Sequence, residues 1–482
     1  MSLFDQELER RLAALREQGL GRCLRRVDSP QATRIRLNGR ELLNFSSNDY
    51  LGLANHPALK EAALRAATQY GAGCGASRLI CGSLAPHHEL EEALAAFKGT
   101  EAALTFSSGY ATALGTVPAL VGKGDVVVID KLVHACIIDA ARLSGAKLRV
   151  FAHKDLDGLE DILKWTDRIR SPKSEVRNPK PDGGPPISDL RPSKRGPRVL
   201  IVTESVFSMD GDLAPLWEME ELKDRYGAWL MVDEAHATGL FGKARRGLVD
   251  QFGLTERVEV QMGTLGKALG AAGGYIAGSR ALIDYLVNRS RSFVFSTAPV
   301  PAAAAAARAG VDLVRSEDGR DRCERLWTRV AECRARLPEA LFDNRALGRA
   351  RRPCRTDPLA GPAQATGRSD PPSGEPPPHP PSGHPLPIGW GEGRGEGQPD
   401  AVPAWSSPIL PLIIGDEAEA VRVGAALLDQ GILLPAIRYP TVARGSARLR
   451  LTLSADHTTG DLALLRQALA AVVPRSALRV PQ

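Results

Sequence analysis

Short apolar runs alternate with segments of helical character between residues 90 and 262. Each run has about the length of a β-strand, and the segments between them, such as 90–97 and 216–226, are rich in Ala, Leu and Glu. This alternation favours a mostly parallel sheet that is covered by helices. We predict strands at 102–106, 126–130, 148–152, 199–203, 229–233 and 258–262.

Polar residues follow the ends of several of these predicted strands. His134, Ser208, Asp233, His236 and Lys267 all lie at such an end or shortly after it. Ligands of open α/β sheets bind at the carboxyl ends of the strands. The positions of these residues therefore predict a shared site at that edge of the sheet.

Two proline-rich segments, about 168–198 and 345–404, interrupt the alternation. They hold seven and fourteen of the 35 prolines and have neither helical nor strand periodicity. Segments with so little apolar content do not offset the entropy lost on ordering, so we predict disordered surface insertions. The alternative is that one of them is a proline-rich ligand for a partner.

Regular structure is expected to resume at 407–414 and to include 447–453, in a small C-terminal α/β domain. We therefore predict an N-terminal helix and arm at 1–45 and a large domain at 46–298. A helix and the small domain follow at 299–482. The two insertions lie inside the large and the small domain.

Composition narrows the classes of function. The chain has 482 residues and is 43% hydrophobic, which suffices for a large domain and a smaller one. The net charge is +6, but residues 168–198 alone hold nine Lys/Arg against three Asp/Glu. The remainder is close to neutral, so we expect no nucleic-acid partner.

The seven cysteines lie apart and form no CxxC pair, which favours a reducing compartment over disulfides or zinc. The first eighteen residues have the pattern of a charged amphipathic helix without the apolar core of a signal peptide. No stretch approaches the roughly 20 apolar residues of a membrane span. We expect a soluble cytoplasmic protein with no membrane partner and no metal.

Lys267 is surrounded by small residues within 264–274, where glycines permit a close approach of the backbone. Upstream, Asp233 ends an apolar run and begins Asp-Glu-Ala-His. Such a lysine can bind an aldehyde cofactor covalently, and a buried carboxylate can keep a pyridine nitrogen protonated. Pyridoxal phosphate needs both groups.

The sequence Asp-Glu-Ala-His also occurs in nucleotide-driven helicases, which need a phosphate loop of the form GxxxxGK[ST]. The nearest match here fails, because Ala268 follows Lys267 and Gln261 replaces the first glycine. In contrast, 107–112 follows a predicted strand and opens a helix, where free backbone N–H groups can bind an anion. An ordinary helix cap explains 107–112 equally well by itself, but beside Lys267 it is a candidate phosphate site.

Eight stretches of the chain carry a wider pattern. They are NFSSNDYLGL (44–53), SRLICG (77–82), SSGY (107–110), TESVFSMDGDLAPL (203–216), MVDEAHATGLFG (231–242), TLGKALGAAGG (264–274), FSTAPVP (295–301) and IRYPTVARGSARLRLTLSADHT (437–458). This set resembles the α-oxoamine synthase family of fold-type I pyridoxal phosphate enzymes. The resemblance implies an α/β fold with a large, mostly parallel sheet domain and a smaller C-terminal α/β domain. The two insertions depart from the family's pattern.

The resemblance implies roles for the matching residues. Lys267 would be linked to the cofactor, Asp233 would pair with its pyridine nitrogen, and His134 would stack on its ring. His236 and Ser208 would contact its phenolic oxygen. The residues implied to hold its phosphate are Ser108, Gly109, Tyr110, Thr264 and, from the neighbouring subunit of a homodimer, Ser296 and Thr297. Those implied to lie near the substrates are Arg438 at the amino acid's carboxylate, Arg25 at the acyl group, Asn48 and Glu204.

The implied reaction is the decarboxylative condensation of an amino acid with an acyl thioester. Within the family, 45–53 and 437–458 look most like the members of biotin biosynthesis, which join L-alanine to pimeloyl-CoA or a pimeloyl carrier protein. One alternative is a sister synthase that uses glycine with a short acyl-CoA, of the glycine C-acetyltransferase or 5-aminolevulinate synthase type. A more distant one is a non-enzymatic interaction protein that acts through its proline-rich segments.

Overall fold

The computed structural model describes residues 1–170, 196–337 and 407–473. The second predicted insertion and most of the first lie outside these residues. Residues 168–170, which we had assigned to the first insertion, instead form the end of a helix. Arg170 is fixed there because its guanidinium donates to the backbone oxygens of Pro197 at 2.8 Å and Tyr226 at 2.6 Å.

The described residues form helices and strands that alternate between β3 and β8. The helices are α1 (Leu3–Glu17), α2 (Pro57–Tyr70), α3 (Ala85–Lys98), α4 (Gly109–Leu120), α5 (Ala135–Ser144), α6 (Leu156–Arg170), α7 (Leu216–Arg225), α8 (Leu248–Gln251), α9 (Arg280–Arg289), α10 (Arg291–Val294), α11 (Pro301–Arg315), α12 (Glu317–Arg336), α14 (Glu417–Asp429) and α15 (Thr459–Val472). The strands are β1 (Arg34–Leu37), β2 (Arg40–Asn44), β3 (Ala102–Phe106), β4 (Val126–Asp130), β5 (Lys147–Phe151), β6 (Val199–Glu204), β7 (Trp229–Asp233), β8 (Val260–Thr264), β9 (Gly274–Gly278), β10 (Ile409–Gly415), β11 (Ile432–Leu433), β12 (Ala436–Ile437) and β13 (Ala447–Thr452).

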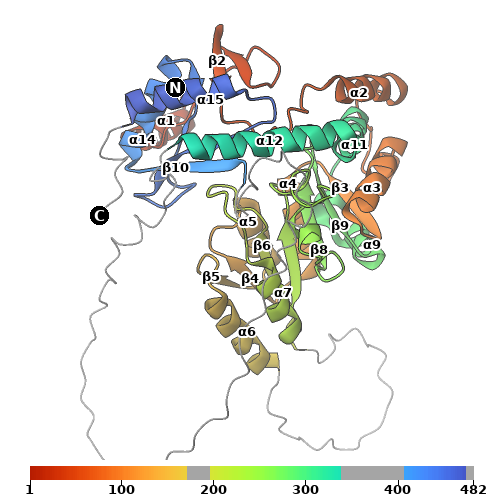
Figure 1. The fold of residues 1–482 in the computed structure, drawn as a ribbon. Coiled ribbons are helices and arrows are strands. Elements are labelled where there is room, and N and C mark those ends of the chain that lie inside the picture. The colour runs from red at the N-terminus through yellow and green to blue at the C-terminus, as the bar shows by residue number, and fades with distance from the viewer. Residues whose placement is uncertain (171–195, 338–406, 474–482) are drawn as a thin grey trace, which may run out of the picture. The chain divides into compact units, whose positions relative to one another are not determined.

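A seven-stranded sheet in the order β3-β9-β8-β7-β6-β4-β5 forms the centre of the fold (Figure 1). The strands from β8 to β5 pair in parallel, whereas β9 is antiparallel to both of its neighbours. Helices α3, α4 and α9 pack near the β3–β9 end, α6 packs near the β4–β5 end, and α7 packs against the central strand β7. The predicted mostly parallel sheet is therefore confirmed, with one antiparallel strand that the sequence did not predict.

The strand interiors are apolar because they are covered on both faces. Every residue of β4 and of β6 is buried, as expected for strands of a covered parallel sheet. Burying one Val, Leu or Ile side chain contributes about 1.5–3 kcal/mol. The polar residues Asp130, Glu204 and Asp233 end these strands, so the core stops where the polar edge begins.

Two smaller sheets involve the end of the chain. One has the order β10-β13-β12 and is antiparallel throughout. The other joins the β1–β2 hairpin of the N-terminal arm to β11, which pairs with β2 in parallel. The long helix α12 contacts α11 at one side and α15 at the other (Figure 1). The predicted domain limits at residues 45 and 298 stay a prediction.

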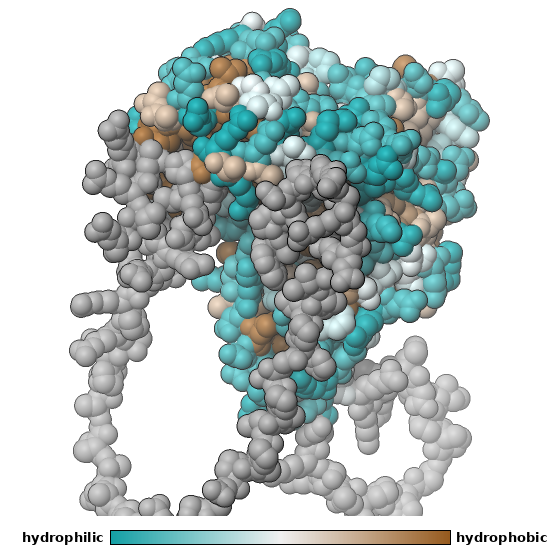
Figure 2. Space-filling view, viewed as in Figure 1, coloured by the Kyte–Doolittle hydropathy of each residue, from teal (hydrophilic) through white to brown (hydrophobic). Residues whose placement is uncertain are grey.

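The face drawn in Figure 2 is mostly hydrophilic, with scattered hydrophobic patches. Among the described residues, no helix combines the length and the apolar character of a membrane span. Helix α1 begins with Ser2 in a capping box and buries none of its residues. Its helical state, but not its packing, follows from the local sequence.

A buried ion pair joins the end of α3 to the turn after β7. Lys98 Nζ lies 2.5 Å from Glu234 Oε2, and both side chains are fully buried. Lys98 also donates to the backbone oxygen of Arg246, and the other carboxylate oxygen of Glu234 accepts from Val249 N–H at 2.9 Å. These bonds satisfy both charges, so the pair fixes the residue that follows Asp233.

We expect Lys98→Met to lower the free energy of unfolding by about 3–5 kcal/mol, because it leaves a buried carboxylate without its cation. Urea denaturation followed by circular dichroism measures this loss. Lys164→Met is the matched control, since Lys164 pairs with Glu160 on the exposed surface of α6 and should give little change. Equal midpoints for wild type and Lys98→Met would show that the pair does not stabilise the fold.

Candidate active site

The carboxyl ends of neighbouring strands bring the predicted residues together. Glu204 and Asp233 are register partners at the ends of β6 and β7, and Thr264 ends the next strand, β8. His134 caps helix α5 just beyond β4, where its ring accepts from Cys136 N–H at 3.2 Å. The polar edge expected from the sequence therefore exists as one surface.

Lys267 and His236 are in direct contact. Lys267 Nζ lies 3.1 Å from His236 Nε2. The other ring nitrogen, Nδ1, lies 2.6 Å from the hydroxyl of Tyr50, which is fully buried. The loop between residues 265 and 273 holds Lys267 here, and Gly270 in it adopts φ +67° with its Cα against Leu53. A side chain at Gly270 would collide with Leu53, which explains the small residue.

Burial shifts the pKa values of Lys267 and Asp233, in each case toward the neutral form. Burial lowers the pKa of Lys267, although the Asp233 and Glu204 carboxylates oppose this effect. Burial likewise raises the pKa of Asp233, against the attraction of Lys267 and a hydrogen bond from Ala235 N–H at 2.9 Å. The site thus holds a lysine that favours its free amine and a carboxylate that a further cation would stabilise.

Glu204 is a second buried carboxyl group beside Asp233. Burial and the neighbouring Asp233 raise the pKa of Glu204 to about 8, while Lys267 lowers it. One carboxyl oxygen accepts from Ser208 N–H at 3.1 Å, and among the described residues the other finds no hydrogen-bond partner. Because two adjacent carboxylates repel each other, Glu204 is the one that keeps its proton near neutral pH.

The start of α4 packs directly against the ends of β8 and β9. Ser108 is its N-cap and accepts from Ala111 N–H at 3.1 Å. A Cβ on Gly109 would lie 2.6 Å from Thr264 Cγ2, and one on Gly274 would lie 2.8 Å from Gly109. The Thr264 hydroxyl beside this helix end is buried and has no hydrogen-bond partner in the part of the chain that the structure describes. The glycines therefore open a cradle of backbone N–H groups with one unpaired hydroxyl, which suits an anion.

Arg450 completes the site from strand β13, and sequence reasoning missed it. Its guanidinium donates to Ser208 O at 2.5 Å, Asn48 Oδ1 at 3.0 Å and Thr452 Oγ1 at 3.1 Å. The side chain is buried although it is charged. The alternation Arg448, Arg450, Thr452 along an otherwise apolar strand was the available signal, because a buried strand rarely carries charges without a function.

The remaining predicted residues make contacts of their own. Arg25 is exposed in the N-terminal arm, and Arg438 donates to Gly21 O of the same arm at 3.1 Å. Tyr110 is exposed and donates to Asp139 at 2.7 Å. Ser296 and Thr297 follow α10, where Ser296 Oγ donates to Thr297 O at 3.1 Å and Thr297 pairs with Ser77 in an isolated bridge. The roles of these five residues at the site stay a prediction.

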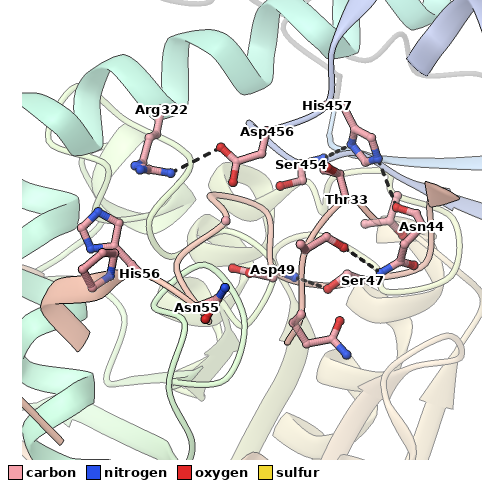
Figure 3. A pocket seen from close by; sticks show the side chains of 15 residues that line it. Thr33, Asn44, Ser47, Asp49, Asn55, His56, Arg322, Ser454, Asp456 and His457 are labelled. Carbon is pink, nitrogen blue, oxygen red and sulfur yellow. Dashed lines mark hydrogen bonds and ion pairs between the residues drawn. The ribbon is translucent and has the colours of Figure 1, made fainter. Parts of the chain in front are cut away.

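A separate polar pocket of about 210 Å³ borders the loop that carries Asn48 and Tyr50 (Figure 3). Arg322 of α12 and Asp456 form an ion pair of 3.4 Å at one side. Asp49 accepts from Leu53 N–H at 2.8 Å, which fixes the turn of the loop. Lys267, Asp233 and His236 do not line this pocket. The pocket is therefore distinct from the site at the strand ends.

The loop that carries Ser208 is held by a histidine between two carboxylates. His153 Nδ1 lies 3.0 Å from Asp130, and Nε2 lies 2.9 Å from Asp212. The ring meets the edge of Phe207 with centroids 4.4 Å apart. Burial alone would lower the pKa of His153, but the two carboxylates outweigh it and raise the pKa to about 9.

These features fit pyridoxal phosphate. Asp233 is a buried carboxylate that a protonated pyridine nitrogen would neutralise, and Lys267 is an amine that can bind an aldehyde. The unpaired Thr264 hydroxyl and the glycine-lined start of α4 would meet the phosphate. In the described part of the chain, no cluster of three or more His, Cys, Asp or Glu residues could hold a metal ion.

Comparison with known proteins agrees with this fit. Residues 40–348 match the family model "Aminotransferase class I and II". The 8-amino-7-oxononanoate synthase of Geobacter sulfurreducens is 41% identical over 451 residues, which are 94% of this chain and 94% of that protein. The enzyme of the same name from Symbiobacterium thermophilum is 39% identical over 96% of both chains.

Solved structures show the same fold at lower identity. A serine palmitoyltransferase structure with pyridoxal phosphate has a TM-score of 0.74 at 24% identity and covers 98% of this chain and 99% of its own. The Sphingomonas wittichii serine palmitoyltransferase also has a TM-score of 0.74 at 24% identity, covering 100% of this chain and 99% of its own. The predicted fold-type I architecture is therefore confirmed.

The charge on His153 gives a prediction about pH. Because its folded pKa of about 9 exceeds the ordinary 6.5, its stabilisation is complete below pH 6.5 and is lost as the pH rises through 9. We expect His153→Gln to be less stable than wild type near pH 6.5, by up to about 3 kcal/mol, with the difference fading above pH 9.

Urea denaturation of both proteins across this pH range measures the difference. His88→Gln is the control, since His88 is exposed and bonds only to Ser83 Oγ at 2.9 Å. A difference between wild type and His153→Gln that stays constant with pH would contradict the assigned charge.

Proposed function

This chain belongs to the class I and II aminotransferase family, within which we propose that it makes 8-amino-7-oxononanoate for biotin biosynthesis. It condenses L-alanine with a pimeloyl thioester, with pyridoxal phosphate as cofactor. The observation that carries this proposal is the nearly full-length match to synthases of that product. The strand-end site supports it, because it supplies the amine, the carboxylate and the anion cradle that the reaction needs.

Lys267 and Asp233 are the residues that would hold the reactive part of the cofactor. When bound, pyridoxal phosphate accepts the electron pair that remains when Cα of the amino acid loses a proton. Asp233 supports this by keeping the ring nitrogen protonated, since a buried carboxylate stabilises a neighbouring cation. His134, at the head of α5, is placed to cover the ring.

Lys267 also serves as the base for the proton on Cα. Burial lowers its pKa, which favours the free amine that can act as a base once the amino acid has displaced it. His236 contacts Nζ of Lys267 at 3.1 Å and keeps its position. The backbone N–H groups of Gly109 and Tyr110 would hold the phosphate. The Thr264 hydroxyl and Ser108 would hold it as well.

Residues of the C-terminal segment would contact the substrates. Arg438 and Arg450 offer two cations for carboxylates, and Asn48 lies beside Arg450 with its oxygen already occupied. The Asn48 amide N–H groups would thereby be left to donate to a substrate oxygen. Arg25 is our candidate for the acyl group, and Glu204 is a candidate proton donor at neutral pH.

The overall reaction balances with one proton taken from solvent. L-alanine loses its Cα proton, Cα bonds to the acyl carbon, and the thiolate that leaves takes up a proton to become the free thiol. The carboxylate then leaves as CO2, and its electron pair stays on Cα, which takes up the second proton. The bond that forms joins Cα of alanine to the acyl carbon. The thiol is coenzyme A or a carrier protein.

We also propose that the protein is a cytoplasmic homodimer. Large hydrophobic side chains are exposed next to Ser296 and Thr297, among them Ile80 at 78% and Phe295 at 72%. A second copy would cover them and bring Ser296 and Thr297 to its own phosphate cradle. The cysteines of the described ranges are all free, as suits a reducing compartment.

Purified protein should turn yellow with pyridoxal phosphate and release thiol mainly with L-alanine and pimeloyl-CoA. The measurement pairs L-alanine, glycine and L-serine with acetyl-, succinyl-, pimeloyl- and palmitoyl-CoA. A yellow protein that prefers glycine and a short acyl-CoA would assign the sister activity instead. A protein that binds no cofactor and releases no thiol would favour a non-enzymatic role.

We expect Lys267→Ala to lose both the covalently bound cofactor and at least about 1,000-fold in turnover, because nucleophile and base are removed together. Borohydride reduction followed by mass spectrometry detects the covalent link, and thiol release detects turnover. Lys243→Ala provides a control on an exposed lysine. Substantial turnover in Lys267→Ala would exclude the assigned role.

A further inference from the structure

Tyr50 faces the active-site histidine but belongs to none of the groups assigned so far. Its hydroxyl lies 2.6 Å from His236 Nδ1. The two rings meet edge to face, with centroids 6.0 Å apart at 66°, so the contact is a hydrogen bond and not a stack. Tyr50 is fully buried, and its backbone oxygen accepts from Ala455 N–H at 2.8 Å. The phenol is therefore held from both ends.

The direction of this hydrogen bond follows from the neighbours of each group. Burial raises the pKa of Tyr50 to about 12, against the attraction of Arg450, so the phenol keeps its proton. The pKa of His236 is held well below its ordinary value, first by burial and then by the neighbouring Lys267, Arg450 and His134 side chains. A neutral phenol therefore meets a neutral imidazole, and one of them must donate.

If His236 Nδ1–H donated to Tyr50, the phenol proton would need another acceptor. The available one is Asn48 Oδ1, which lies 3.5 Å away and already accepts from Arg450 at 3.0 Å. A contact of 3.5 Å is weak, whereas 2.6 Å is a strong O–H···N distance. The donation from Tyr50 to Nδ1 is therefore favoured, and the imidazole proton then resides on Nε2.

We propose that Tyr50 is a positioning residue that fixes His236 as the Nε2–H tautomer and so aims a hydrogen-bond donor at the reaction side of Lys267. In the protein itself, this Nε2–H donates to the amine of Lys267 at 3.1 Å. The consequence for catalysis rests on the proposed function, in which the same donor would meet the phenolic oxygen of the cofactor. The opposite tautomer would present a lone pair to that oxygen and repel it.

Asn48 and Arg450 extend the control of this tautomer to the C-terminal segment. Arg450 occupies Asn48 Oδ1, which makes Asn48 a poor acceptor for Tyr50. The phenol is thereby left with one good acceptor, His236 Nδ1. The sequence of contacts from β13 through Asn48 and Tyr50 sets the proton position on His236 without touching the reacting atoms.

The test is ¹⁵N NMR of histidine-labelled full-length protein, recorded with and without pyridoxal phosphate. The chain has nine histidines, and His236→Gln identifies the signals of His236. Wild type should show a protonated Nε2 and an unprotonated Nδ1. Tyr50→Phe, which keeps the ring and removes the hydroxyl, should move both signals toward a mixture of tautomers.

Turnover provides the second measurement on the same variants. We expect Tyr50→Phe to lower kcat about 10-fold, equal to about 1.4 kcal/mol or one neutral hydrogen bond, with KM nearly unchanged. Tyr275→Phe is the matched control, because Tyr275 is also fully buried and its hydroxyl bonds to Thr238 Oγ1 at 2.8 Å. It should leave the His236 signals and kcat near wild type while losing similar stability.

A protonated Nδ1 in wild type would overturn the proposal without any variant. So would His236 signals in Tyr50→Phe that match wild type. Because the NMR signals do not depend on substrate, a protein with the expected tautomer but a different amino acid or acyl preference would retain this inference and change only the proposed function.

Discussion

The structure depends on keeping ionisable groups out of water at one edge of a sheet. Asp233, Glu204, His236 and Lys267 share a site in which every one of them has lost most of its solvent. Desolvation favours the neutral form of each, so the site is charge-poor until a cationic ring arrives. This arrangement makes Asp233 a strong partner for a protonated nitrogen and Lys267 a usable nucleophile.

Such a site needs rigid neighbouring residues, because a buried polar group without a partner is costly. These neighbouring residues do not take part in the reaction. The Lys98–Glu234 pair fixes the turn after β7, and His153 clamps the loop of Ser208 between two carboxylates. Glycines at 109 and 274 let α4 approach the strand ends. Each of these interactions involves residues that neighbour a reacting residue in the chain or in space, and none involves the reacting group itself.

The sheet and most of the polar edge could be predicted because apolar runs end in polar residues at regular intervals. Strand β9 could not, since Gly274–Gly278 begins and ends in glycine and is antiparallel to its neighbours. The β1–β2 hairpin had an unused signal, an Asn38-Gly39 turn in which both residues have positive φ. Tyr50 and Arg450 were missed because Tyr50 meets a residue 186 positions away and Arg450 meets one 402 positions away, which no local pattern records.

The pairing of β2 with β11 has a consequence for how the chain is made. Strand β2 ends at Asn44, but its parallel neighbour begins at Ile432, and Arg450 reaches Asn48 from later still. A ribosome adding about 5–20 residues per second leaves this N-terminal edge open for tens of seconds. During that interval the arm presents unpaired backbone groups to other chains. Folding helpers that bind nascent chains would find their target in this arm, long before the active site exists.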